Sequence, residues 1–157
     1  MNSNAWSVIE MKISTKGRYG LRALLDLAVH SQGEHVPLSN IAERQNISEN
    51  YLEQVFSALR KAGIINSVKG AQGGYVLADQ AEKIKVGTIL RVLEGDLSVA
   101  NEEWQPEGGV TIQECIQRKV WDEITNRINQ YVDSITLEDL VQEYNVMCGN
   151  GGVMYYI

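Results

Sequence analysis

Residues 47–77, ISENYLEQVFSALRKAGIINSVKGAQGGYVL, decide the fold. Ser48 is a favourable N-cap, and a stripe of apolar residues at three- and four-residue spacing follows it, which predicts a helix with one buried face. The stripe consists of Leu52, Val55, Phe56 and Leu59. Gly63 then marks the helix end. The β-type run at 64–68, the glycine-rich turn at 69–74 and the run at 75–77 predict a two-stranded hairpin.

The residues before and after this stretch predict further helices. Apolar periodicity indicates a helix from about 15 to 30, a short helix over 37–45 and another over 86–95. Asn46 and Ile47 form a tight turn before Ser48. Helix, short helix, turn, capped helix and hairpin in this order is the winged helix-turn-helix arrangement. We therefore expect a mainly α fold with a small β-hairpin wing.

The C-terminal part of the chain has a different character. Residues 96–110 are polar, acidic and interrupted by Pro and Gly, which is typical of a loop. Thr111 then caps a long helix to residue 134, and Thr136 opens a last short helix. We expect an N-terminal extension at 1–10, a DNA-binding domain at 11–95, a loop at 96–110, dimerisation helices at 111–147 and a tail at 148–157. We predict that the extension is disordered and that Met11 is a second start.

The charge distribution fits a nucleic-acid-binding module joined to an acidic one. The net charge is −6, but residues 11–95 hold eleven Lys and Arg against eight Asp and Glu, whereas residues 96–157 hold three against eleven. A basic module can face DNA while an acidic one faces away. No apolar run is long enough for a membrane span, and the first ten residues do not form a secretion signal. We expect a cytoplasmic protein.

The outer face of the helix after Ser48 predicts base recognition. Asn50, Glu53 and Gln54 lie opposite the apolar stripe, together with Ser57 and Lys61. Asn and Gln can bond an adenine edge through two hydrogen bonds, and Glu can accept from cytosine. Lys69 at the hairpin tip can reach an adjacent groove or phosphate. The residues alone leave two alternatives open: a merely solvated helix face, and a module that binds proteins.

A family resemblance favours DNA binding. The segments MKISTKGRYGLRALLDLA, 47–77 and VGTILRVLEG resemble the Rrf2 family of bacterial regulators, with KGRYG, YLEQ, LRKAG and the GGY wing in order. This resemblance implies a winged helix-turn-helix dimer that represses or activates promoters. It implies DNA contacts at Asn50, Glu53 and Gln54, at Lys69, and near the first helix at Lys16, Arg18 and Tyr19.

The long helix predicts a two-fold dimer. An isoleucine-rich stripe runs along one side of it, and one small module cannot cover that stripe completely. We place the dimer interface on Ile116, Val120, Ile124 and Ile128. Two recognition helices would then lie on successive major grooves of a pseudo-palindromic operator.

Cysteine usage argues against a metal cluster. One branch of the Rrf2 family holds a [2Fe–2S] cluster on three Cys and one His before the long helix, and thiolates are what such clusters need. Here only Cys115 matches that pattern, and Arg118 stands at the His position. We therefore expect no cofactor and no metal, and a buried Cys115 on the helix. A redox role for Cys148 stays open.

The sequence does not indicate an enzyme. No set of acid, base and nucleophile is evident, and His30 and His35 fall at a helix end and in a polar turn. The GAQGG run is not a phosphate-binding Walker loop, because no G-K-[ST] follows at the required spacing. A wing tip accounts for its glycines.

Within the Rrf2 family, the chain most resembles the repressors of cysteine metabolism. They share MKISTKGRYGL, lack the cluster cysteines and end in two aromatic residues and Ile. The resemblance implies a complex with cysteine synthase, in which Tyr155, Tyr156 and Ile157 would imitate the C-terminal peptide of that enzyme's acetyltransferase partner. Ala71-Gln72 and the 96–115 segment depart from this branch. Two alternatives stay open: a thiol- or stress-responsive regulator without an enzyme partner, and a tail that docks on its own dimer.

Overall fold

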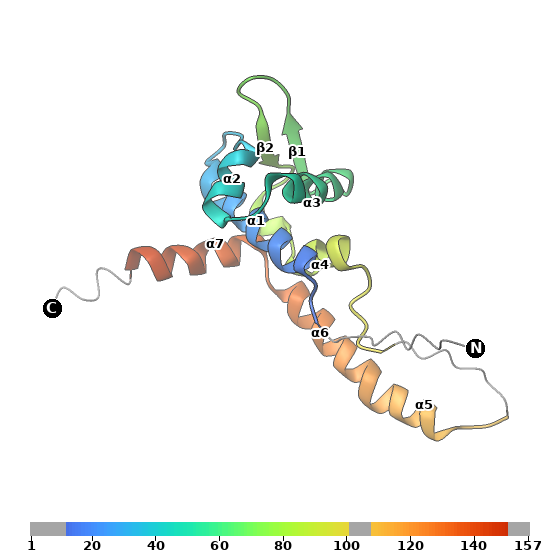
Figure 1. Cartoon of the computed structure of the whole chain (residues 1–157). Coiled ribbons are helices and arrows are strands. Elements are labelled where there is room, and N and C mark those ends of the chain that lie inside the picture. Colours follow the sequence, from blue (N-terminus) through green and yellow to red (C-terminus); the bar gives the residue numbers. More distant parts are fainter. Residues whose placement is uncertain (1–11, 101–107, 151–157) are drawn as a thin grey trace, which may run out of the picture.

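The computed structural model describes residues 12–100 and 108–150, so the predictions for the extension at 1–10 and for Tyr155, Tyr156 and Ile157 lie outside the described residues. The N-terminal part consists of α1 (Thr15–Ser31), α2 (Leu38–Gln45), α3 (Glu49–Lys61), β1 (Ile65–Val68), β2 (Gly74–Leu77), η1 (Ala81–Lys83) and α4 (Val86–Glu94). In Figure 1, α1, α2 and α3 pack together and the hairpin of β1 and β2 projects from them. The prediction of a mainly α fold with a small hairpin wing is confirmed.

The helix boundaries follow the capping residues. The Ser14 side chain accepts a hydrogen bond from the Gly17 N–H at the start of α1. Ser48 accepts one from the Tyr51 N–H at 3.2 Å, as its N-cap position predicts. Between α2 and α3, Asn46 takes a left-handed conformation with φ of 53°, which its short polar side chain tolerates. The turn predicted at 46–47 therefore lies where the sequence places it.

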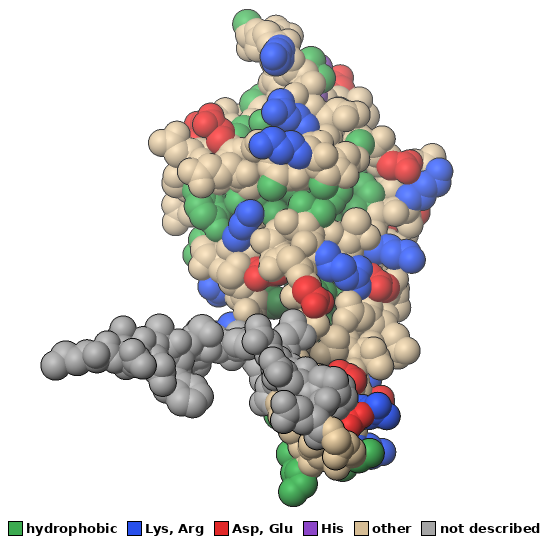
Figure 2. Space-filling model, turned by 90° about the vertical axis from the view of Figure 1, so that its right-hand side faces the viewer, with side chains coloured by type: hydrophobic (Ala, Val, Ile, Leu, Met, Phe, Trp, Pro, Cys, Tyr) green, Lys and Arg blue, Asp and Glu red, His purple; other side chains and the backbone are tan. Residues whose placement is uncertain are grey.

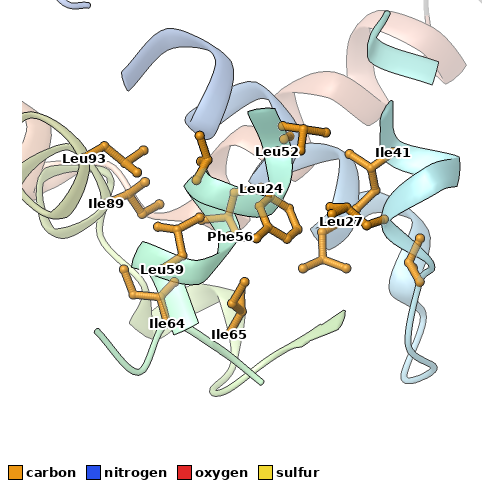
Figure 3. Packing of buried hydrophobic residues seen from close by; sticks show 14 of the residues in the cluster. Leu24, Leu27, Ile41, Leu52, Phe56, Leu59, Ile64, Ile65, Ile89 and Leu93 are labelled. Atoms are coloured by element: carbon orange, nitrogen blue, oxygen red, sulfur yellow. The ribbon is translucent and has the colours of Figure 1, made fainter. Parts of the chain in front are cut away.

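The core lies where α1, α2, α3 and the hairpin meet (Figure 3). The four residues of the α3 stripe are each at most 1% exposed, and Leu24, Leu27 and Ile41 are fully buried beside them. Burial of such a side chain contributes about 1.5–3 kcal/mol. This core fixes which face of α3 points outward.

The wing is attached to the core by its second strand. β1 and β2 pair antiparallel, with Ile65 opposite Leu77 and Val68 opposite Gly74. Tyr75 and Val36 exchange two main-chain hydrogen bonds of 2.8 Å, and the Tyr75 ring meets Phe56 edge-on at 5.0 Å. A Cβ at position 74 would lie 2.4 Å from the Val36 backbone, so only Gly fits there. The hairpin is therefore held firmly at its base while its tip projects outward.

The long C-terminal helix is continuous but not uniform. It consists of α5 (Ile112–Ile116), a π-helical segment η2 (Gln117–Trp121) and α6 (Asp122–Ser134), whereas the sequence predicted one regular helix. The apolar residues from 112 to 128 recur every four residues, which drifts around a helix of 3.6 residues per turn. A π-helical turn contains more residues than an α-helical turn, so it brings the apolar residues back to the same side of the helix.

The last helix, α7 (Leu137–Asn145), starts at the predicted Thr136 with a capping box, in which Thr136 and Asp139 bond each other's backbone. A π-helical segment, η3 (Val146–Asn150), continues it. The first residues of the expected tail, 148–150, are therefore helical, because the α7 backbone extends past the predicted boundary. None of the helices in the described ranges has the length and hydropathy required to cross a bilayer.

The junction between α6 and α7 joins the C-terminal helices to the winged module. The Val86 N–H donates to Ile135 O at 2.9 Å, and the Leu137 N–H donates to Ile84 O at 2.8 Å. Leu137 is fully buried in the main core. The other end of the long helix, at α5, extends away from the compact part (Figure 1).

Candidate nucleic-acid interface

The outer face of α3 presents hydrogen-bonding groups to solvent. Asn50, Glu53, Gln54 and Lys61 are exposed, and Ser57 is half-buried. The buried stripe on the opposite face prevents these side chains from turning inward. Amide and carboxylate groups on an exposed helix face are suited to reading base edges in a major groove. The structure therefore brings Asn50, Glu53 and Gln54 together on one helix.

The wing tip adds a cation at a distance from α3. Lys69 is exposed in the turn between β1 and β2. Figure 2 shows Lys or Arg side chains at the tip of the hairpin and below it. The Arg60 guanidinium at the end of α3 donates to Ser67 Oγ on β1 at 3.4 Å. This contact joins the end of α3 to β1.

The start of α1 forms a third part of the candidate interface. Lys16 and Arg18 are exposed, but Tyr19 is half-buried and packs against the core. The Tyr19 ring meets Tyr51 of α3 edge-on, with centroids 6.2 Å apart. Glu94 at the end of α4 accepts hydrogen bonds from the Ser14 N–H, the Ser14 hydroxyl and the Gly17 N–H, so α4 holds the first turn of α1 in place.

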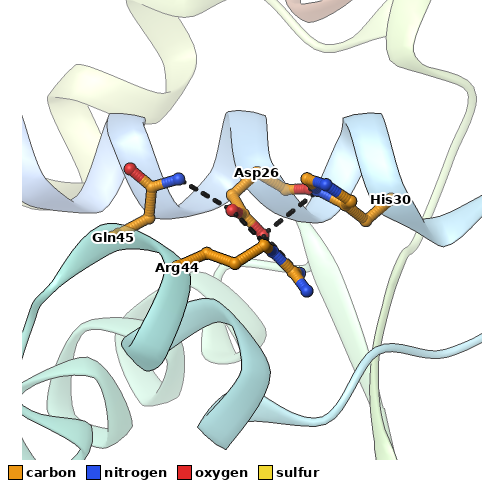
Figure 4. Close-up of polar contacts among 4 residues, drawn as sticks. All are labelled: Asp26, His30, Arg44 and Gln45. Atoms are coloured by element: carbon orange, nitrogen blue, oxygen red, sulfur yellow. Dashed lines mark hydrogen bonds and ion pairs between the residues drawn. The ribbon is translucent and has the colours of Figure 1, made fainter.

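Sequence analysis missed an ionic cluster around one buried carboxylate, formed between α1 and α2 (Figure 4). Asp26 of α1 is 4% exposed and accepts hydrogen bonds from Arg44 and from the Gln45 amide. The bond with Asp26 raises the pKa of Arg44 above its ordinary value. The missed signal was a charged residue inside an apolar helix face, between Ala23 and Leu27.

A family model matches most of the chain. The model of the Rrf2 family, described as an iron-dependent transcriptional regulator, matches residues 13–143. The chain belongs to the Rrf2 family. This Rrf2 chain is 41% identical over 138 residues to the HTH-type transcriptional regulator IscR of Photobacterium profundum. The aligned region covers 87% of this chain and 78% of the relative. It is a DNA-binding transcriptional regulator of the Rrf2 type.

Solved structures of Rrf2 regulators have the same fold. CymR, the global cysteine regulator of B. subtilis, superposes with a TM-score of 0.71 at 42% identity, over 84% of this chain and 97% of that chain. The IscR of T. potens superposes with a TM-score of 0.73 at 43% identity, over 92% of this chain and 96% of that chain. These relatives are regulators and not enzymes, which agrees with the absence of catalytic motifs in the sequence.

The residues of this Rrf2 chain do not fit a thiolate-held iron–sulfur cluster. The whole chain has two cysteines. Cys115 lies on α5 and Cys148 lies in η3, at opposite ends of the C-terminal helices (Figure 1). Within 12–100 and 108–150, no group of three or more His, Cys, Asp and Glu side chains is placed to hold a metal ion.

The prediction that Cys115 is buried is wrong for the single chain. Cys115 is exposed, because α5 extends beyond the module and no described part of the same chain covers it. This exposure leaves the thiol of Cys115 accessible unless a second chain covers α5.

The expected dimer stripe changes its environment along the helix. Ile112 is 83% exposed, Ile116 41% and Val120 38%. In contrast, Ile124 and Ile128 are half-buried, and Ile128 packs on a cluster of Val86, Leu90 and Leu97 in its own chain. Only the α5 and η2 part of the stripe is therefore strongly exposed.

Proposed function

We propose that this Rrf2 regulator is a dimeric repressor of genes for sulfur and cysteine metabolism, acting in the cytoplasm without an iron–sulfur cluster. The observation that carries the proposal is the combination of an exposed recognition face on α3 with a chain that lacks the thiolates for a cluster. Two such faces related by two-fold symmetry would read a pseudo-palindromic operator, with half-sites about 34 Å apart.

The apolar surface of the long helix supports the dimer. Its exposed residues Ile112, Ile116 and Val120 form an unpaired apolar strip on a helix that extends from the module. A cavity of about 490 Å³ lies farther along, between the end of α4, the 96–99 segment and α6, with Ile128 and Val132 in its wall. Apolar strips of this kind on a soluble protein mark association sites. A second long helix is the partner of matching shape and chemistry.

We assign different roles to the candidate DNA contacts. Gln54, Glu53 and Asn50 read base edges, because their side chains carry the amide and carboxylate groups that discriminate base pairs. Lys69, Lys16 and Arg18 bind phosphates, because a flexible cation supplies affinity without sequence information. Tyr19 contributes mainly through its packing on Tyr51.

The regulon and the partner rest on similarity. The chain is 42% identical to CymR, a global cysteine regulator, and 43% identical to the IscR of T. potens, but it has two cysteines in total. A regulator that cannot hold a cluster on thiolates needs another signal. Cysteine synthase is the partner we propose, captured by the C-terminal Tyr155, Tyr156 and Ile157.

One observation favours a second candidate, a thiol-responsive regulator without an enzyme partner. Cys148 is exposed, and a hydrogen bond with its thiol raises the pKa of Tyr144, one helical turn away. An exposed thiol at the end of a helix that packs on α1 is accessible to oxidants. This candidate keeps the DNA-binding assignment and changes the signal.

Genome-wide mapping of the promoters bound by the regulator in its source organism tests both candidates. Enrichment at genes for cysteine synthesis and sulfur transport, with raised transcription after deletion of the regulator, is the result we expect. Enrichment confined to oxidant-response genes would favour the thiol-responsive candidate. Binding spread without preference over the genome would contradict sequence-specific regulation.

A further inference from the structure

The helix-turn-helix turn is held by an arginine that sequence analysis did not select. Arg22 of α1 donates a hydrogen bond from Nη2 to the main-chain oxygen of Gln45 at 2.6 Å. Gln45 is the last residue of α2, and its side-chain amide donates to Asp26 Oδ2 at 2.7 Å. The next residue, Asn46, turns the chain toward α3 with φ of 53°. Arg22 therefore fixes the backbone at the point where the turn begins.

The same guanidinium also contacts the start of the recognition helix through an aromatic pair. The Arg22 guanidinium carbon lies 4.8 Å from the centre of the Tyr19 ring. Tyr19 in turn meets Tyr51 edge-on, at an interplanar angle of 84°. Tyr51 lies in the first turn of α3, where its N–H bonds the Ser48 cap. One side chain thus links the end of α2 to the beginning of α3.

We infer that Arg22 is a positioning residue for sequence reading, which acts through the placement of α3. The planar guanidinium makes a charge-assisted hydrogen bond and a cation–π contact at the same time, so two interactions hold one side chain in place. Their loss frees the turn and lets the first turn of α3 shift. Asn50 and Gln54 then lose their alignment with base edges, whereas phosphate contacts from flexible lysines survive. This inference rests on the proposed base-reading role of α3.

A pair of substitutions on one helix separates positioning from phosphate binding. Arg22→Met and Arg18→Met remove the same charge from exposed positions four residues apart. The side-chain hydrogen bond of Arg18 goes to Thr15 in its own helix, and its guanidinium carbon lies 5.9 Å from the centre of the Tyr19 ring, against 4.8 Å for Arg22. Arg18→Met therefore removes a longer contact with Tyr19 and leaves the bond to the Gln45 carbonyl of α2 intact. Dissociation constants are measured for the operator and for a random duplex of equal length over a salt series. Thermal unfolding of each variant verifies that it folds.

We expect Arg22→Met to weaken operator binding about tenfold, the loss typical of one charged hydrogen bond. Its affinity for random DNA and its salt slope stay unchanged. Arg18→Met weakens binding to both duplexes and lowers the slope of log affinity against log salt concentration by about 0.9. Arg22→Lys keeps the charge but lacks the planar group, so we expect it to lose as much specificity for the operator as Arg22→Met does.

Three results would overturn the inference. Equal losses on both duplexes with a shallower salt slope would make Arg22 a phosphate ligand. Full recovery by Arg22→Lys would show that charge alone matters. An unchanged ratio of operator to random affinity would remove any role in specificity. If the unaltered protein itself fails to distinguish the two duplexes, the base-reading assignment fails instead, independently of Arg22.

Discussion

Asp26 and Arg44 form an ion pair between α1 and α2, with the Arg44 Nη2 2.7 Å and Nε 3.1 Å from the Asp26 carboxylate oxygens. The Asp26 side chain is fully buried, whereas the Arg44 side chain is 35% exposed. A buried carboxylate needs its partners, since burial without them is costly. The pair therefore fixes α2, and with it the turn to α3, on the first helix.

Asp26→Asn tests this arrangement. The substitution keeps the shape of the side chain but removes the charge that pairs with Arg44, and it replaces one of the two acceptor oxygens by an amide donor. We therefore expect the free energy of unfolding to fall by about 1–3 kcal/mol. The loss stays moderate because the exposed side of Arg44 can be solvated. Urea unfolding monitored by circular dichroism measures it, with Glu82→Gln, an exposed carboxylate on η1, as the matched control. An unfolding free energy equal to that of the control would contradict a stabilising pair.

Gln54→Ala and Lys69→Ala separate base reading from electrostatic affinity. We expect Gln54→Ala to weaken operator binding by about 1–3 kcal/mol while random DNA is bound as before. We expect Lys69→Ala to weaken binding to both the operator and random DNA and to lower the salt slope by about 0.9, because one phosphate contact is lost. Fluorescence anisotropy over a salt series distinguishes them. Equal losses on operator and random DNA for Gln54→Ala would refute its base-reading role.

The dimer interface is best tested at α5. Ile116→Asp, on the exposed part of the stripe, is expected to give a folded monomer that binds the operator poorly. Ile128→Asp and Ile124→Asp are less decisive than the sequence suggested, because both residues are half-buried in the single chain and a charge there lowers stability. Ile128 in addition packs on the cluster of Val86, Leu90 and Leu97. Sedimentation velocity measures the mass. A dimer of Ile116→Asp with full operator affinity would exclude this interface.

The sequence predicted the winged module well because its elements are defined locally. Ser48, the α3 stripe and the hairpin glycines each act over a few residues, so their periodicity specified the fold. The contacts between Asp26 and Arg44 and between Arg22 and Gln45 depend on how α1 crosses α2, which no local pattern encodes. The exposure of Cys115 likewise depends on how far α5 extends from the module.

Iron binding gives a direct test of the cysteine argument. Protein purified without oxygen is expected to be colourless and to contain no stoichiometric iron or sulfide, because two cysteines at opposite ends of the C-terminal helices cannot supply the thiolates of a cluster. Absorbance spectroscopy and elemental analysis measure this. A [2Fe–2S] regulator of the same family, prepared in parallel, controls for cluster loss. Visible absorbance with stoichiometric iron and sulfide would refute the prediction.

The C-terminal tail decides between the two candidate signals. Val153 to Ile157 have apolar and aromatic side chains, which would gain free energy by burial in an apolar pocket of a partner. We expect its terminal carboxylate to be bound by backbone N–H groups of cysteine synthase, with Ile157 in an apolar pocket. O-acetylserine would occupy the same site and lower the apparent affinity by mass action.

Calorimetry with purified cysteine synthase compares the intact chain, a chain without Ile157 and a chain with one added residue. We expect both altered chains to lose binding and O-acetylserine to weaken binding of the intact chain. The hypothesis fails if the intact chain does not bind, or if binding ignores both the alterations and O-acetylserine. Self-docking of the tail and a thiol signal would then be the remaining explanations.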